Sequence, residues 1–328
     1  MLFNLLLFIH ALYRLVYSVL FVNHFYFRKD LLKQVTEVYR QKEQKIEPKY
    51  FKRIYYHGIL GSITNEWFTT LRGYPQTNQE AKAGFYLGTA TAVYDDLFDH
   101  YNFTMDESLE DLAKGRYKND NVTERLSKLF YDIILDNLKD RTHFDLYLRK
   151  VGLLQEESKK QETDELSEAD LRRITYEKGG YSVALSRSIL EHEYRPGEDE
   201  AIYILGCLIQ YTDDVFDIRR DYLGKIATLG TTTQDIRKIR AEYEGLIYKS
   251  FEAFKKLNYP PRKLQQFFMQ ILIIVSRGMV CLNQLVRVQE KHGGPFQIEK
   301  YSRAELVCDM EKPINMFRSF WYCLRWKM

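Results

Sequence analysis

Turn-forming residues are scarce in this chain of 328 residues, which contains 7 prolines and 17 glycines. No Asn-Gly or Asp-Gly pair joins two alternating apolar segments, so the usual hairpin signals of an all-β protein are missing. There is also no His-Glu-x-x-His motif, which argues against a zinc hydrolase. The 4 cysteines form no Cys-x-x-Cys pair, so we expect no disulfide framework and a reducing compartment: Cys207, Cys281, Cys308 and Cys323.

An excess of charge of one sign is lacking as well. Lys and Arg number 48 against 45 Asp and Glu, and the net charge of +3 provides no strong basic field. We therefore expect no nucleic-acid partner. Aromatic residues, in contrast, make up 15% of the chain, so many rings are available for a core or for a pocket.

The first long apolar segment covers residues 2–27, and we treat 1–29 as an apolar N-terminal helix before a domain over 30–328. The segment lacks the basic start and the cleavage site of a secretory signal. Arg14 near its middle would cost about 2.5–3.5 kcal/mol at a bilayer centre, which opposes a transmembrane span. We expect a helix packed on the domain, in the cytoplasm. Peripheral membrane binding is the alternative, because Arg28, Lys29 and Lys33 follow the segment.

The remaining apolar residues recur mostly with the 3.6-residue period of helices, and no linker separates domains. The fold class that we predict is all-α, a single helical bundle. The expected helices cover residues 5–28, 30–45, 48–71, 78–101, 121–138, 142–158, 167–193, 199–224, 231–256, 261–291 and 299–325.

Two groups of aspartates each end an apolar helical segment. In the first, Asp95, Asp96 and Asp99 form a DDxxD pattern whose members share a helix face. No basic residue lies beside them in the sequence. Acidic side chains are almost never buried unless they are paired, and hard carboxylate oxygens suit Mg²⁺. A pair of solvated helix ends is the simpler interpretation of one such group, but two groups after apolar turns favour metal binding.

In the second group, Asp213, Asp217 and Asp221 are spaced i, i+4, i+8 and form one stripe of carboxylates. Asp214 lies beside them. Arg220 is placed either to bind diphosphate or to pair with Asp217 or Asp221, and we leave both roles open.

With DDLFD at 95–99 and Q-x-x-D-D-x-x-D at 210–217, the sequence resembles the class I isoprenoid (terpenoid) synthase superfamily. The resemblance implies an all-α bundle with a central apolar cavity, in which two acidic motifs bind three Mg²⁺ ions and a prenyl diphosphate. The implied metal ligands are Asp95, Asp96, Asp99, Asp213, Asp217 and Asp221. Compared with the second motif of terpene cyclases, this chain has Asp at the three ligand positions where that pattern usually has Asn, Ser and Glu. The ligand set is therefore less certain there. Read instead as a polyprenyl synthase motif, the same segment uses Gln210 and Asp214.

A third segment, EKGGYSVAL at 177–185, places Lys178 before two glycines inside a helical pattern. Adjacent glycines cost about 1 kcal/mol each in a helix, so they indicate a helix break or a close approach. A broken helix with a basic diphosphate contact is what the superfamily resemblance implies here. This segment is most similar to sequences of the large terpene synthase, or tetraprenyl-β-curcumene synthase, group.

The chemistry implied is loss of diphosphate, which needs positive charge near the leaving group and aromatic faces near the allylic cation. The predicted catalytic residues are Lys178, Tyr181, Arg219 and Arg220. The predicted substrate-binding residues are Phe85, Tyr94, Phe98, Gln210, Tyr211 and Asp214, although for any single ring core packing is the favoured interpretation. No arginine pair follows the first motif, which favours cyclisation or elimination over condensation. A condensing prenyltransferase and a non-catalytic metal-binding protein stay as alternatives, and a homodimer is left open.

Overall fold

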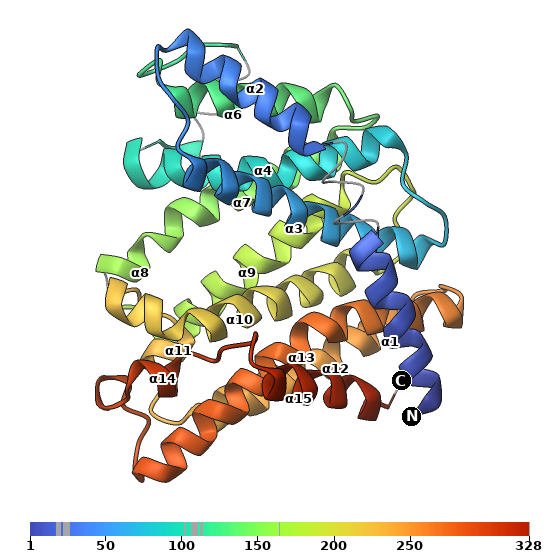
Figure 1. The fold of residues 1–328 in the computed structure, drawn as a ribbon, viewed down its shortest axis with the longest axis vertical. Coiled ribbons are helices and arrows are strands. Elements are labelled where there is room, and N and C mark those ends of the chain that lie inside the picture. Colours follow the sequence, from blue (N-terminus) through green and yellow to red (C-terminus); the bar gives the residue numbers. More distant parts are fainter. Residues whose placement is uncertain are drawn as a thin grey trace. The chain divides into compact units, whose positions relative to one another are not determined.

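The computed structural model describes residues 1–17, 21, 27–101, 103–105, 111, 114–163 and 165–327. Within these ranges the secondary structure is helical and contains no strand (Figure 1). The all-α class predicted from the sequence is therefore confirmed. Contacts within the chain group into two compact units, which are described separately. Unit 1 comprises Met1–Ala11, Glu157–Ala184 and Tyr194–Met328, and unit 2 comprises Leu12–Glu156 and Leu185–Glu193.

Unit 2 is built around two long helices whose backbones nearly touch. A Cβ atom at Gly88 would lie 2.2 Å from the carbonyl oxygen of His57, and one at Gly61 would lie 2.3 Å from that of Gly84. Only glycine permits this approach, so the two helices pack closely at these positions. The helices of this unit are α2 (Arg28–Gln41), α3 (Pro48–Arg72), α4 (Asn78–Tyr101), α6 (Val122–Leu135) and most of α7 (Thr142–Ser158).

Unit 1 surrounds α13 (Pro261–His292), a 32-residue helix long and apolar enough to cross a membrane by composition alone. Its apolar window is 67% buried within the protein, which is the property of a core helix. The other helices here are α1 (Leu2–Arg14), α8 (Lys160–Thr163), α9 (Glu168–Arg187), α10 (Glu198–Gly224), α11 (Leu229–Thr232), α12 (Ile236–Lys255), η2 (Ile298–Lys300), α14 (Arg303–Leu306) and α15 (Pro313–Arg325). Helices α1 and α9 each continue into unit 2.

Several of the predicted boundaries need correction. The predicted helix over 299–325 is wrong, because Pro313 lacks an amide hydrogen and holds Lys312 extended, so a separate helix begins there. The helix predicted over 231–256 begins at Ile236, where the Asp235 side chain accepts a hydrogen bond from the Arg237 amide. Helix α9 ends at Arg187, before the predicted residue 193. Part of the predicted 5–28 helix, residues 18–20 and 22–26, lies outside the described residues.

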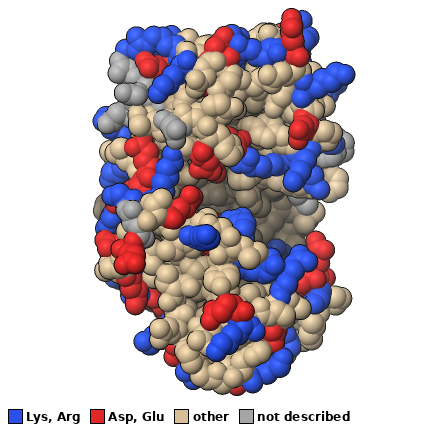
Figure 2. Space-filling model, turned by 90° about the vertical axis from the view of Figure 1, so that its left-hand side faces the viewer, with Lys and Arg blue, Asp and Glu red and all other residues tan. Residues whose placement is uncertain are grey.

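Surface charge is mixed. Figure 2 shows Lys and Arg side chains interspersed with Asp and Glu over the visible face, as the small net charge of +3 predicts. The visible face therefore has no broad basic field.

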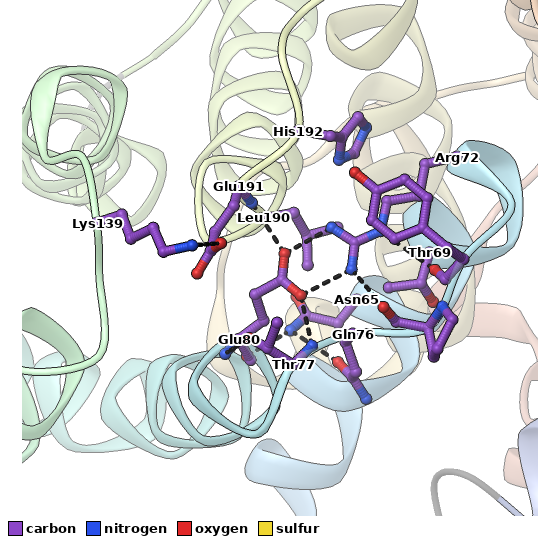
Figure 3. Close-up of polar contacts among 12 residues, drawn as sticks. Asn65, Thr69, Arg72, Gln76, Thr77, Glu80, Lys139, Leu190, Glu191 and His192 are labelled. Atoms are coloured by element: carbon purple, nitrogen blue, oxygen red, sulfur yellow. Dashed lines mark hydrogen bonds and ion pairs between the residues drawn. The ribbon is translucent and has the colours of Figure 1, made fainter.

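Buried charge in unit 2 is concentrated where α3 turns into α4. We call Arg72, Thr77, Glu80, Lys139 and Glu191 the Arg72–Glu80 cluster. Figure 3 shows Arg72 and Glu80 pointing at each other, with N–O distances of 2.5 and 2.7 Å. Glu80 also accepts hydrogen bonds from the amides of Thr77 (2.7 Å) and Glu191 (2.9 Å). Burial would raise the pKa of Glu80, but these donors hold it below its ordinary value.

Candidate functional site

The first aspartate group lies near the C-terminal end of α4, after an almost wholly buried apolar stretch. Asp96 is buried, with 9% of its surface exposed, whereas Asp95 is half-buried and Asp99 is exposed. The helix therefore turns part of the motif inward and leaves part accessible, as expected for carboxylates at the edge of a core.

A cation reaches this group from the neighbouring helix. Arg53 on α3 donates to Asp96 Oδ1 at 2.7 Å and to the carbonyl of Ala92 at 3.0 Å. This cation comes from another helix and not from the local sequence, in which no basic residue lies beside the group. Burial and the negative charge of Asp96 raise the pKa of Tyr50, so this phenol stays protonated beside the carboxylate.

The rings predicted on α4 lie within unit 2. Phe85 is fully buried and stacks on Phe27, with 5.0 Å between centroids. The hydroxyl of Tyr94 is buried without a hydrogen-bond partner among the described residues, and burial raises the pKa of Tyr94. Phe98 is 4% exposed. Phe85 thus has the contacts of a core residue, and a substrate role for the three rings stays a prediction.

The second group lies in the last turns of α10, where Asp213, Asp217 and Asp221 form what we call the α10 stripe. Arg220 is 2.5 Å from Asp217 and 3.7 Å from Asp221. It therefore pairs with both carboxylates. Burial and the charge of Asp213 raise the pKa of Asp217 to about 6, and burial also raises that of Asp221. The stripe carries more negative charge than its contacts balance.

Asp214 is turned away from this stripe toward α9. It accepts hydrogen bonds from Gln210 at 2.9 Å and from Thr175 at 3.1 Å. Burial raises the pKa of Asp214 to about 7, and the charge of Asp213 adds to the rise. Two of the predicted substrate-binding residues, Gln210 and Asp214, are therefore brought together as partners of each other.

The double glycine of α9 permits close packing and does not break the helix. Helix α9 runs without interruption through Gly179 and Gly180. A Cβ at Gly179 would lie 2.3 Å from the carbonyl oxygen of Gly206 on α10, and one at Gly180 would lie 2.3 Å from the ring of Tyr203. The expected helix break is wrong and the expected close approach is confirmed.

The close approach places Lys178 next to the acidic end of α10. Burial raises the pKa of Asp214 and of Asp221, and the ammonium of Lys178 is near enough to oppose both rises. Lys178 is half-buried and comes from a different helix than the stripe. The sequence therefore identified a basic residue that the fold brings to the second aspartate group. Its role toward diphosphate stays a prediction.

The other predicted residues of unit 1 differ in their surroundings. Tyr181 is half-buried and meets Tyr203 edge to face, with 5.5 Å between centroids. Tyr211 is 1% exposed, and its hydroxyl donates to Glu242 at 3.3 Å. Arg219 is half-buried. The contacts of Tyr211 tie α10 to α12, which is a structural role that the sequence alone did not reveal.

Glu242 on α12 is a charged residue that sequence analysis missed. It accepts hydrogen bonds from Arg172 at 2.8 Å and from Tyr176 at 2.6 Å. Burial would raise the pKa of Glu242, but these donors hold it below its ordinary value. No local motif marks Glu242, because its partners come from α9, 66–70 residues earlier.

The carboxylates of both groups have the donor chemistry of a magnesium site. Among the residues described, no three His, Cys, Asp or Glu side chains converge to hold a metal ion. Mg²⁺ is commonly bound by one or two carboxylates, with water and phosphate oxygens completing its shell. The α10 stripe fits such an ion. Arg220 is shared by two of its three carboxylates, which leaves negative charge that a cation could balance. The first group lies in unit 2 and the second in unit 1, and their meeting at one cavity stays a prediction.

The sequence matches no protein-family model and no curated protein. In a search of solved structures, a dehydrosqualene synthase in complex with ligand is similar to the chain. The TM-score is 0.47 and the identity 14%, over 84% of this chain and 95% of that one.

Proposed function

We propose that the chain is a Mg²⁺-dependent class I isoprenoid synthase that removes diphosphate from a linear prenyl diphosphate. The observation that carries the proposal is the α10 stripe. Three carboxylates share one helix face, two of them are paired with the single Arg220, and Lys178 lies close by. Repulsion between neighbouring carboxylates destabilises a helix, so this spacing does not serve the fold. The same cluster of negative charge would attract divalent cations, which in turn bind diphosphate.

Each set of side chains has a distinct task in this proposal. Bound Mg²⁺ would supply Lewis-acid stabilisation of the charge that develops on the departing diphosphate. Asp213 and Asp217, with the first aspartate group, would hold the ions. Lys178 and Arg220 would donate charge-assisted hydrogen bonds to phosphate oxygens. We expect Arg220 to exchange part of its contact with Asp217 for the diphosphate. Phe85, Tyr94, Phe98 and Tyr181 remain the predicted rings near the allylic chain.

A one-substrate reaction, cyclisation or elimination, is the first candidate, because no arginine pair follows the first motif. Arg53 favours a second candidate, a condensing prenyltransferase of the chain-elongating or head-to-head kind. Its guanidinium lies at Asp96, and a second diphosphate needs basic side chains of this type. A non-catalytic metal-binding protein is the alternative to both.

The experiment is a diphosphate-release assay with farnesyl, geranylgeranyl and longer prenyl diphosphates, with Mg²⁺ and with or without isopentenyl diphosphate. Product from one allylic substrate alone identifies a cyclase or a lyase, or a head-to-head enzyme when two substrate chains are joined. A requirement for isopentenyl diphosphate identifies an elongating enzyme. No diphosphate release from any substrate refutes the enzyme proposal and leaves the metal-binding alternative.

A thermal-shift experiment tests whether the two aspartate groups share one ligand. Inorganic diphosphate with Mg²⁺ should raise the midpoint of unfolding of the parent protein, because it binds only the folded state. Asp95→Asn and Asp213→Asn should each remove most of that rise. If either variant keeps the full shift, the groups do not act on the same diphosphate.

A further inference from the structure

Helix α1 exposes apolar side chains where a helix on a protein surface normally presents polar residues to water. Its buried residues are Asn4, Leu7 and Ala11, and Asn4 donates to the carbonyls of Leu324 at 3.0 Å and Trp326 at 2.8 Å. The exposed residues of the α1 helix that belong to unit 1 are Leu2, Phe3, Leu6 and Ile9.

Helix α15 likewise exposes large apolar side chains. Asn315 and Ser319 are buried, with Asn315 donating to the Asp309 carbonyl at 2.8 Å and Ser319 lying 2.6 Å from Ser276. The large apolar residues that α15 exposes are Ile314, Met316, Phe317 and Trp321, and Phe317 is 56% exposed.

The two helices lie side by side in unit 1. Phe8 and Phe320 meet edge to face with 4.9 Å between centroids, and Asn4 bridges to the end of α15. Figure 1 shows dark blue α1 next to the dark red helix α15. The exposed residues of the two helices therefore belong to one region of the surface, which we call the α1/α15 face. Large exposed apolar patches mark sites of interaction.

The charge around this face indicates its partner. Neither α1 nor α15 contains Asp or Glu, whereas α15 carries Arg318 and Arg325, both exposed, and Lys327 follows. Asp309 and Glu311 lie before α15, at the end that also holds Lys312. The guanidinium of Arg325 sits over the ring of Trp321, 5.1 Å from its centroid. Aromatic rings beside basic residues are typical of the level of lipid headgroups.

We propose that the α1/α15 face binds the surface of a membrane containing anionic lipids. Phe3, Leu6 and Phe317 would enter the boundary between headgroups and acyl chains, and Arg318 and Arg325 would meet the anionic headgroups. A second copy of the chain is a poorer occupant. In a two-fold dimer the same arginines would face each other, and neither helix has a carboxylate to pair with them. The proposal does not depend on the enzymatic activity proposed above.

The test uses the full chain in flotation experiments. We expect it to float with vesicles of phosphatidylcholine and phosphatidylglycerol, and added salt should release it in part. With phosphatidylcholine alone, binding should be weaker. Leu6→Glu with Phe317→Glu should lower the vesicle-bound fraction at least about tenfold, because two apolar anchors become acidic. Leu146→Glu, on the 49%-exposed Leu146 of α7, is the matched control and should bind as the parent does.

A second pair of substitutions tests the electrostatic part. Arg318→Gln and Arg325→Gln should each weaken binding to phosphatidylglycerol vesicles about fivefold and reduce its salt dependence. All variants should keep the parent's helical circular dichroism, since the substituted residues are exposed.

Three results would overturn the proposal. A parent protein that floats with neither kind of vesicle refutes it. An equal loss of binding in the Leu146→Glu control shows that another surface is responsible. A dimer that Leu6→Glu with Phe317→Glu dissociates, in a chain that ignores vesicles, shows that the face is covered by a second copy.

Discussion

The carboxylates of the Arg72–Glu80 cluster in unit 2 and those of the α10 stripe in unit 1 differ in how many donors and cations surround them. Glu80 receives two hydrogen bonds from Arg72 and two more from backbone amides. Glu124 is likewise buried and accepts from the amides of Lys118, Asn119 and Asn121. The stripe, in contrast, has Arg220 as the cation for Asp217 and Asp221.

This difference separates structural carboxylates from those kept for a ligand. A buried carboxylate that serves the fold needs a full set of donors, because its desolvation is otherwise costly. The donors of Glu80 are part of the protein and are always present. We propose that the donors and cations of the α10 stripe arrive with the substrate. The following predictions test this distinction.

The largest expected effect is on stability, from Arg72→Met. It leaves Glu80 buried without its cation, which we expect to lower the free energy of unfolding by about 3–5 kcal/mol. Denaturant titration measures the change. Lys255→Met, which breaks the exposed pair with Glu252, is the control and should cost less than about 1 kcal/mol. Equal losses from the two variants would mean that the Arg72–Glu80 cluster does not stabilise the fold.

The next effect is on activity, from Asp213→Asn. The variant removes a proposed metal ligand, and we expect diphosphate release to fall about 100-fold or more, equivalent to roughly 2.7 kcal/mol. The free protein should be as stable as the parent or about 0.2–0.5 kcal/mol more stable, because repulsion along the stripe is relieved. A marked loss of stability in the absence of Mg²⁺ would assign Asp213 to the fold instead.

A smaller effect concerns the packing that brings Lys178 beside the stripe. A Cβ at Gly206 would lie 2.2 Å from the carbonyl oxygen of Gly179, so Gly206→Ala should force α9 and α10 apart and cost about 1–3 kcal/mol. Gly245 on α12 has open space around it, and Gly245→Ala should stabilise the protein by about 0.5–1 kcal/mol. Opposite signs in thermal unfolding would confirm that the glycines of α9 and α10 serve close packing.

The smallest expected effect on stability is that of Arg53→Gln. Arg53 is 41% exposed in its pair with Asp96, so the loss should be at most about 1 kcal/mol. If Arg53 binds diphosphate, the variant should raise the KM for a prenyl diphosphate, and Arg53→Lys should recover only part of the affinity. An unchanged KM in both variants would limit Arg53 to orienting Asp96.

Much of the fold follows from local sequence. The periodic apolar residues predicted helices over 78–101 and 142–158, and α4 and α7 have these bounds. The same reasoning failed at Pro313, where one apolar pattern continued across a residue that breaks the helix. Local patterns thus identify helices well when the capping and breaking residues are also read.

The candidate site was predictable only where its residues lie on one helix. The stripe could be predicted from the spacing of four residues between its aspartates. Arg220, which pairs with Asp217, lies in the same turns of the helix. The contact of Arg53 with Asp96 spans 43 residues and depends on how α3 packs against α4. The partnership of Tyr211 with Glu242 is similarly a tertiary contact. No periodicity in the sequence encodes contacts of this kind, because they are set by the packing of whole helices.

The hydrogen bond of Asn4 to the carbonyl of Leu324 joins residues 320 apart in sequence. It also sets an order of events during biosynthesis. At ~5–20 residues per second, α1 leaves the ribosome on the order of half a minute before α15 is made. During that interval the side of α1 that carries Asn4 lacks its protein partner. Unit 1 can therefore complete its packing only when the last helix has been translated.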